Sequence, residues 1–160
     1  MAQHLTDPIG PFTGEFRFLS NFFPCAVVYD TIPYPTAEHA FQAAKTLDRA
    51  LRDRIRVFPT ASAAKRSGRS LVLRADWEQV KLTVMAEILR EKFRHPVLHA
   101  QLLRTHPRPL VEVNTWGDHF WGVCHGTGEN HLGRLLIALR REFLIEAQPP
   151  ATTDPRRAVS

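Results

Sequence analysis

Three polar side chains share one face of a helix predicted early in the chain. Glu38, Gln42 and Lys45 occupy positions i, i+4 and i+7 of the segment 36–45, so a carboxylate, an amide and an ammonium line up along it. The apolar residues from Ala37 to Ala44 form a core-facing side roughly 110° away. The polar face is either the wall of a cleft, where Glu38 and Lys45 can perform acid–base or nucleophilic chemistry, or a solvated surface.

A second polar group consists of three cations beside a glycine that ends a predicted helix. Lys65, Arg66 and Arg69 surround Gly68, and guanidinium groups bind phosphate through paired N–H donors. Cations at the C-terminal end of a helix also interact favourably with its dipole without binding a ligand. The segment therefore indicates either a phosphate site or a solvated helix end.

Residues 116–122 combine aromatic rings, glycines and a carboxylate. Trp116, Asp118, Trp121 and Gly122 fall within this stretch, which can form a platform for a flat ring with a carboxylate beside it. A helix is predicted to begin at His131, and its free N–H groups can form an anion site close by. The alternative is that the tryptophans pack over a sheet edge.

Composition limits the class of protein. With 160 residues, 44% hydrophobic and 23% charged, the chain is expected to form one soluble domain. Two cysteines are too few for a disulfide framework, and no secretory signal or membrane-spanning run is visible, so we expect a cytoplasmic protein without membrane contact. The net charge of +5 favours anionic partners, including phosphorylated small molecules and nucleic acid, although the cations form no basic arm.

Motifs for common cofactors and metals are absent from the sequence. It contains no Gly-x-Gly-x-x-Gly, P-loop lysine or Gly-x-Ser-x-Gly pattern, which argues against dinucleotide oxidoreductases, kinases and esterases. Pro96 separates His95 from His99, and the later histidines do not match tight zinc spacing. We therefore expect neither a cofactor nor a metal.

Hydrophobic periodicity and turn residues predict a mostly helical α+β domain with a few short strands. Helices are expected over 36–45, 49–57, 60–68, 76–95, 97–104 and 131–147. Strands are expected over 14–20, 25–30 and 109–114, and residues 116–128 are interpreted as a loop or short strand pair. Residues 1–13 are expected to be a loose lead-in, residues 14–147 the domain, and residues 148–160 a disordered tail.

Taken together, these segments resemble the NADAR family, also described as the YbiA-like domain. The matching segments are FLSNF (18–22), YPTAEHAFQAAK (34–45), AKRSGR (64–69), DW (76–77), KF (92–93), LVE (110–112), DHFWG (118–122) and GENHLGR (128–134). They follow the family order from about residue 12 to residue 145. Departures are small: Thr31 stands where glycine is usual and Thr36 where serine is common.

The resemblance implies a small α+β domain that acts on N-glycosidic bonds of ribose. One associated activity hydrolyses the bond between ribose 5-phosphate and an aminopyrimidine in early riboflavin intermediates, and we favour it. The other removes ADP-ribose from modified guanine bases in DNA. The expected partner is thus a phosphorylated ribosyl small molecule or an ADP-ribosylated nucleic acid. A third possibility is a non-catalytic module that binds ADP-ribose or related nucleotides.

Cleavage of a C1′–N bond builds positive charge on the ribose, which a carboxylate stabilises. Glu38 is the first catalytic candidate and Asp118 the second, while Lys45 either forms an imine with ring-opened ribose or stays charged. The remaining candidates are expected to bind substrate: Arg17, Ser20, Asn21, Gln42, Lys65, Arg66, Gly68, Arg69, Trp116, Trp121, Gly122 and Asn130. The oligomeric state is left open by the sequence.

Overall fold

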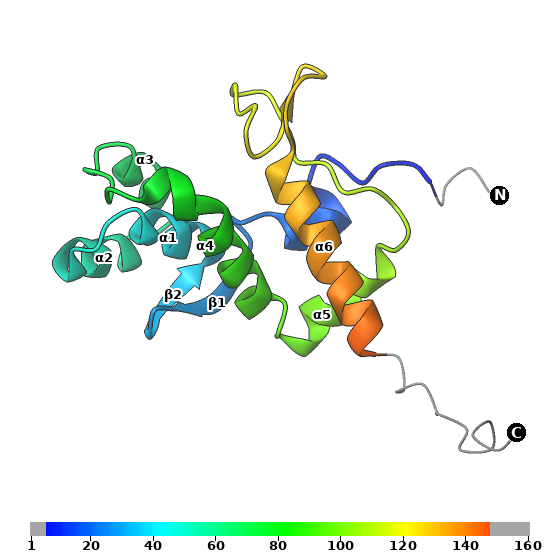
Figure 1. Ribbon diagram of the computed structural model, residues 1–160, viewed down its shortest axis with the longest axis horizontal. Coiled ribbons are helices and arrows are strands. Elements are labelled where there is room, and N and C mark those ends of the chain that lie inside the picture. The colour runs from blue at the N-terminus through cyan, green and yellow to red at the C-terminus, as the bar shows by residue number, and fades with distance from the viewer. Residues whose placement is uncertain (1–5, 148–160) are drawn as a thin grey trace, which may run out of the picture.

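A computed structural model describes residues 6–147 of the chain (Figure 1). Within them lie a 3₁₀-helix, six α-helices and four short strands. Their bounds are η2 (Gly14–Leu19), β1 (Pro24–Tyr29), β2 (Ile32–Thr36), α1 (Ala37–Ala44), α2 (Arg49–Arg56), α3 (Ala61–Gly68), α4 (Trp77–Lys92), α5 (Pro96–Arg104), β3 (Val113–Asn114), β4 (Val123–Cys124) and α6 (His131–Glu146). The predicted α+β, mostly helical fold class is confirmed. The predicted tail, residues 148–160, lies outside the described residues.

The hairpin β1–β2 delivers the chain directly into α1. Its strands pair antiparallel from Pro24 opposite Thr36 to Tyr29 opposite Ile32. The turn residues Asp30 and Thr31 both have positive φ, 47° and 67°, which is the backbone of the turns that match strand twist. Thr36 ends β2 and caps α1, since its Oγ1 accepts a hydrogen bond from the His39 N–H at 3.2 Å. The start of α1 is therefore fixed by local chemistry.

Helix α4 runs through the middle of the molecule and separates two groups of elements (Figure 1). It contacts β1, α1 and α6. On one side lie the hairpin and α1–α3, and on the other lie α5 and α6 (Figure 1). Every residue of α1 is buried, because this helix packs against α2, α3 and α4 together. Any polar side chain that α1 carries must therefore face a neighbouring element or an internal pocket.

Residues 109–130 form a long irregular segment at the N-terminal end of α6 (Figure 1). It contains the parallel pair β3–β4, in which Val113 lies opposite Val123 and Asn114 opposite Cys124. The lead-in is attached here as well, since Ile9 forms a parallel bridge with Leu110. Ile9 and Phe12 are buried. The described part of the expected loose lead-in therefore belongs to the packed domain, while residues 1–5 lie outside the described residues.

Two strand predictions were wrong. Residues 14–20 form η2 rather than a strand: Gly14 has φ +55°, and the adjacent residues Phe18 and Leu19 are both buried instead of alternating. Their aromatic content serves core packing, because Phe18 lies edge-on to Phe93 with ring centroids 6.4 Å apart. Within 109–114 only the last two residues form a strand. The strand β2 was not predicted, because two prolines interrupt its pattern.

The helix predictions were confirmed close to their expected bounds. None of the helices within residues 6–147 has the length and apolar character required to cross a membrane.

Candidate active site

A pocket of roughly 230 Å³ opens where α1, α3 and α4 meet the segment 109–130. The lining contains many of the residues predicted for the site: Ser20, Asn21, Glu38, Gln42, Lys45, Lys65, Trp116, Asp118 and Trp121. It also contains five residues that were not predicted: Phe22, Phe41, Met85, Glu112 and Leu132. Segments as far apart in sequence as Ser20 and Leu132 thus contribute to one cavity. The polar face of α1 is the wall of a cleft and not a solvated surface.

Glu38 is held deep in this wall. Its side chain is buried, its Oε1 accepts a hydrogen bond from Gln42 Nε2 at 2.7 Å, and its N–H donates to the Asn21 carbonyl at 3.0 Å. Burial raises the pKa of Glu38, whereas the Gln42 hydrogen bond and the charges of Lys65 and Lys45 act in the opposite direction. The negative charge of Asp118 adds to the rise in pKa.

Gly68 leaves the space that Gln42 fills. A Cβ at Gly68 would lie 1.8 Å from Gln42 Oε1 and 2.7 Å from Gln42 Cδ. The end of α3 and the middle of α1 can therefore approach only with glycine at this position. Gly68 does not line the pocket; it acts by letting Gln42 reach Glu38.

Lys45 follows α1 as its C-terminal cap and lies two helical turns beyond Glu38. Its Nζ is 5.7 Å from the centre of the Phe41 ring. Burial lowers the pKa of Lys45; Glu38 opposes this shift, and the positive charges of Lys65 and Arg69 add to it. A lysine in such surroundings gives up its proton more readily and is a better nucleophile than a solvated one.

Asp118 is oriented by backbone donors. Its Oδ1 accepts hydrogen bonds from the N–H of Phe120 at 3.2 Å and of Trp121 at 2.8 Å. The side chain of Asn114 fixes the same turn, since it donates to the Asp118 carbonyl and accepts from the Asp118 N–H. A carboxylate is thereby held at the pocket wall in a defined direction.

The aromatic platform is divided between the inside and the rim of the pocket. Trp121 packs edge-on against Phe41, with ring centroids 5.2 Å apart. Trp116 is 61% exposed, and Lys65 Nζ lies 5.2 Å from the centre of its ring and 5.5 Å from that of Phe22. Trp116 thus presents an open ring face beside a cation, whereas Trp121 shapes the interior.

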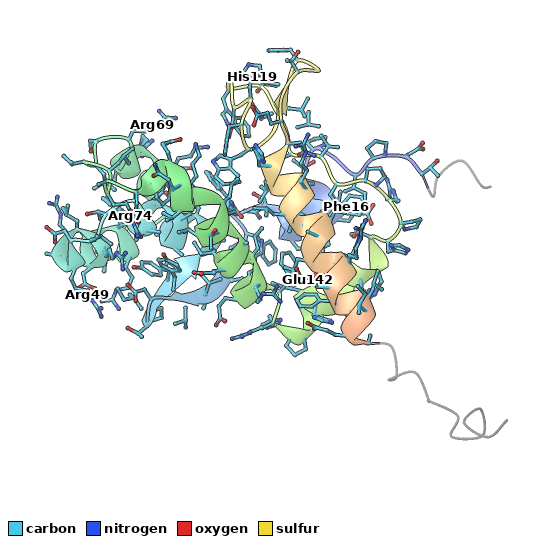
Figure 2. The ribbon with its side chains drawn as sticks, viewed as in Figure 1. Phe16, Arg49, Arg69, Arg74, His119 and Glu142 are labelled. Carbon is cyan, nitrogen blue, oxygen red and sulfur yellow. The ribbon has the colours of Figure 1, made fainter. Side chains whose placement is uncertain are left out.

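The predicted phosphate group lies in a second hollow that adjoins the pocket. It too measures roughly 230 Å³, and it shares Phe22, Lys65 and Trp116 with the pocket. Arg66 and Arg69 belong to this second hollow and not to the pocket. Figure 2 shows Arg69 on the α3 side of the molecule and His119 in the segment 109–130. Arg66 and Arg69 therefore lie beside the pocket, while Lys45 and Lys65 line it.

Three more predicted residues lie outside the pocket lining. Arg17 is on the exposed side of η2. Asn130 uses its amide internally, donating to the Leu110 carbonyl at 2.9 Å and accepting from the Glu112 N–H at 3.0 Å. Gly122 lies against the backbone of Glu112, where a Cβ would come 2.2 Å from the carbonyl oxygen. Gly122 and Asn130 therefore position Glu112.

Glu112 itself was missed as a site residue. The sequence offered a signal, because Glu112 lies in one of the segments that match the family and on the polar side of an alternating pattern. Within residues 6–147 the structure contains no group of three or more His, Cys, Asp or Glu side chains arranged to hold a metal ion. Carboxyl groups that line a pocket can transfer protons and stabilise positive charge.

Comparison with known proteins gives a consistent picture. The NADAR domain family matches residues 11–144. The N-glycosidase YbiA of Escherichia coli is 46% identical over 136 residues, which cover 82% of this chain and 84% of the relative. An N-glycosidase of Nostoc punctiforme is 36% identical and covers 78% of this chain and 83% of its own. A riboflavin biosynthesis protein of Vibrio vulnificus is 38% identical over 79% of this chain but only 35% of that longer protein.

The fold agrees with this similarity. The NMR structure of the Escherichia coli protein YbiA superposes with a TM-score of 0.80 and 39% identity, covering 92% of each chain. The match of sequence and of fold extends over nearly the whole described domain, including every segment that lines the pocket. The chain belongs to the NADAR domain family.

Proposed function

We propose that this protein hydrolyses the C1′–N bond of a phosphorylated ribosylamine, namely an aminopyrimidine ribose 5-phosphate of riboflavin biosynthesis. One observation carries the proposal: a single pocket contains Glu38, Lys45 and Asp118 and opens onto a cationic rim. The names of the relatives support it, since they include N-glycosidases and a riboflavin biosynthesis protein.

The reaction needs a negative charge close to C1′. As the base departs, positive charge develops on the ribose, and Glu38 stabilises it across the pocket. The same carboxylate accepts a proton from the water that attacks C1′. Asp118 adds a second fixed negative charge to the wall. Glu38 is buried, so its interaction with the developing cation is strong.

Lys45 has a lowered pKa and can act in two ways. As a neutral amine it adds to C1 of ring-opened ribose and forms an imine, which water later hydrolyses. As an ammonium it holds the phosphate or the leaving group. The two roles differ in whether a covalent bond joins Lys45 to the sugar.

The substrate's phosphate and base are assigned to neighbouring groups of the adjoining hollow. Lys65, Arg66 and Arg69 bind the phosphate through charge-assisted hydrogen bonds, and Trp116 stacks on the base. Asn21 contributes a polar contact, since its Oδ1 is buried at the pocket and accepts no hydrogen bond from any described residue. An unsatisfied acceptor of this kind is stabilised by a donor on the ligand.

The test is direct detection of the freed base by chromatography after incubation with the aminopyrimidine ribose 5-phosphate. Glu38→Gln and Lys45→Ala should each lower kcat about 100-fold or more while changing KM far less. Full activity of either purified variant would remove that residue from the mechanism. Borohydride trapping followed by mass spectrometry decides the role of Lys45, because only an imine gives a stable adduct at that residue.

A second candidate function is supported by the adjoining hollow. Because Lys65 and Trp116 are shared by the pocket and the hollow, a longer ligand with two phosphates and a second base can extend from one into the other. Removal of ADP-ribose from guanine in DNA is therefore the alternative, and an ADP-ribosylated oligonucleotide belongs in the same assay. Tight binding of both substrates without turnover would instead indicate a nucleotide sensor. We also propose a cytoplasmic location, consistent with the free thiols of Cys25 and Cys124.

A further inference from the structure

Glu112 carries a side chain that the fold itself does not use. The residue lines the pocket, and its Oε2 is buried without a hydrogen-bond partner among residues 6–147. A buried carboxylate without donors is unfavourable, whereas a protonated carboxyl tolerates such a site and keeps its O–H available for a ligand. The position therefore favours the neutral acid.

The charges around Glu112 act in the same direction. The pKa of Glu112 is raised to about 7, and burial is the largest cause. The negative charges of Asp118 and Glu38 also act to raise this pKa, and the positive charges of Lys65 and Lys92 act to lower it. These four groups come from the segment 109–130, α1, α3 and α4, so every wall of the pocket contributes. Two carboxyl groups in one pocket thus have unlike surroundings, the pattern that separates an acid from a base.

Glu38 has the surroundings of the base. Burial raises the pKa of Glu38 too, but the charges of Lys65 and Lys45 oppose this rise, and its Oε1 already accepts the Gln42 amide proton at 2.7 Å. A hydrogen bond to the charged form favours that form. Glu112 lacks such a bond at Oε2. The difference assigns opposite proton-transfer roles to the two glutamates.

The backbone of Glu112 is fixed on both sides. Its N–H donates to Asn130 Oδ1 at 3.0 Å, and its carbonyl accepts from the Val123 N–H at 2.8 Å. Asn130 adopts the left-handed conformation, with φ 54°, to make this contact, and Gly122 leaves room for the carbonyl. Several structural devices thus hold in place a carboxyl group whose Oε2 bonds to nothing in the fold. Catalytic groups need positioning of this kind.

We propose, on the basis of the function proposed above, that Glu112 is the catalytic acid that protonates the departing base. The C1′–N bond breaks, its electron pair stays on the base nitrogen, and that nitrogen takes the proton of the Glu112 carboxyl. Water adds to C1′, and its surplus proton passes to Glu38. Glu112 then regains a proton and Glu38 loses one to solvent through the open pocket, so the net reaction consumes one water. An amine nitrogen is a poor leaving group as an anion, which is why the proton is required.

The deciding experiment measures the pH dependence of kcat/KM for Glu112→Gln with the aminopyrimidine ribose 5-phosphate. Wild-type kcat/KM should fall as the pH rises through about 7, where Glu112 loses its proton. Glutamine keeps the shape of the side chain but carries no acidic proton. In Glu112→Gln, kcat should therefore drop about 100-fold, and the decrease of kcat/KM with rising pH (the falling limb of the pH profile) should disappear. Glu112→Asp should also be slow but should retain the falling limb, because it is still an acid. It replaces the glutamine variant if that one does not fold.

The matched control is Glu129→Gln, which neutralises an exposed glutamate in the same segment and should keep wild-type rates. If the wild type is active, a Glu112→Gln variant that is equally active, or in which kcat/KM still falls as the pH rises through about 7, overturns the inference alone. A wild type that frees no base from either substrate overturns the proposed function and the inference with it.

A measurement without turnover completes the test: the ¹³C carboxyl signals of labelled glutamate should include one that titrates near neutral pH and is missing in Glu112→Gln. Titration of that signal only below pH 5 would refute the inference.

Discussion

Replacing Lys92 with methionine should weaken the dependence of stability on pH. Lys92 ends α4, is fully buried, and donates from Nζ to the Ser20 carbonyl at 2.7 Å. The rings of Phe93 and Phe23 lie 5.2 and 5.7 Å from the ammonium. Burial lowers the pKa of Lys92 from 10.5 to about 7, against the opposing charges of Cys25 and Glu112. The Lys92 ammonium therefore bonds to the backbone of Ser20, which lines the pocket. Its burial costs the hydration free energy of the charged group.

The sign and size of the effect follow from proton linkage. In the unfolded chain Lys92 has a pKa of 10.5 and keeps its proton up to that pH, whereas in the folded protein its pKa is about 7. The unfolded state thus carries more protons between these values, so stability rises with pH there and is lost as the pH falls through 7. The full range corresponds to about 5 kcal/mol at most, and the interval from pH 6 to pH 9 to about 2 to 3 kcal/mol.

The assay is urea denaturation of the wild type and Lys92→Met at both pH values, with the free energy of unfolding taken at each. The free energy of unfolding of the wild type, minus that of Lys92→Met, should be larger at pH 9 than at pH 6 by about 2 kcal/mol or more. Lys81→Met is the control, since this lysine on the same helix is paired with Glu78 at the surface. If the difference in unfolding free energy between the wild type and Lys92→Met does not change with pH, no buried ammonium titrates at this position.

Gly68→Ala should lower stability by about 2 kcal/mol in urea denaturation, because its Cβ displaces the Gln42 amide, although alanine is ordinarily the better helix former. The double variant Arg66→Gln/Arg69→Gln should raise KM about tenfold with little change in kcat, and should reduce the sensitivity of KM to salt. Trp116→Ala should weaken substrate binding about tenfold in calorimetric titration, through the loss of a stacking surface.

Each of these variants has a counterpart that isolates its cause. Ser67→Ala changes the neighbouring residue of α3 without the clash and should be nearly neutral. Arg54→Gln removes one positive charge from the exposed side of α2; an equal rise in KM there would attribute the effect to net charge instead of the hollow. Trp116→Phe should restore most of the binding, and its failure to do so would argue against stacking.

The polar face of α1 could be predicted because every signal for it is local. Thr36 caps the helix through a hydrogen bond three residues away, and the period of the helix alone puts Glu38, Gln42 and Lys45 on one side. The apolar face and the cap together predicted the bounds of α1. No long-range contact is needed for any of these conclusions.

Residues whose roles depend on distant contacts could not be assigned in this way. Asn130 was predicted to bind substrate, but its amide bridges the carbonyl of Leu110 and the N–H of Glu112, twenty and eighteen residues earlier. At the helix N-terminus that suggested an anion site, the N–H groups of His131 and Leu132 donate instead to the carbonyls of Phe120 and Trp121. Nothing in the spacing of residues 128–134 reveals which backbone groups will lie beside them.

The distribution of charge is the part of the site that depends most on the tertiary fold. A net charge of +5 predicts only a preference for anions, yet the interior of the pocket contains Glu38 and Glu112, while Arg66 and Arg69 lie in the adjoining hollow with Lys65 between the two. A phosphate is therefore attracted to the cations of the hollow, whereas a ribose that becomes positive is stabilised beside Glu38. The same ligand is oriented by both effects, with its C1′–N bond toward the glutamates. Because α3 supplies the cations and α1 and the segment 109–130 supply the carboxylates, this orientation exists only when the three elements are packed together.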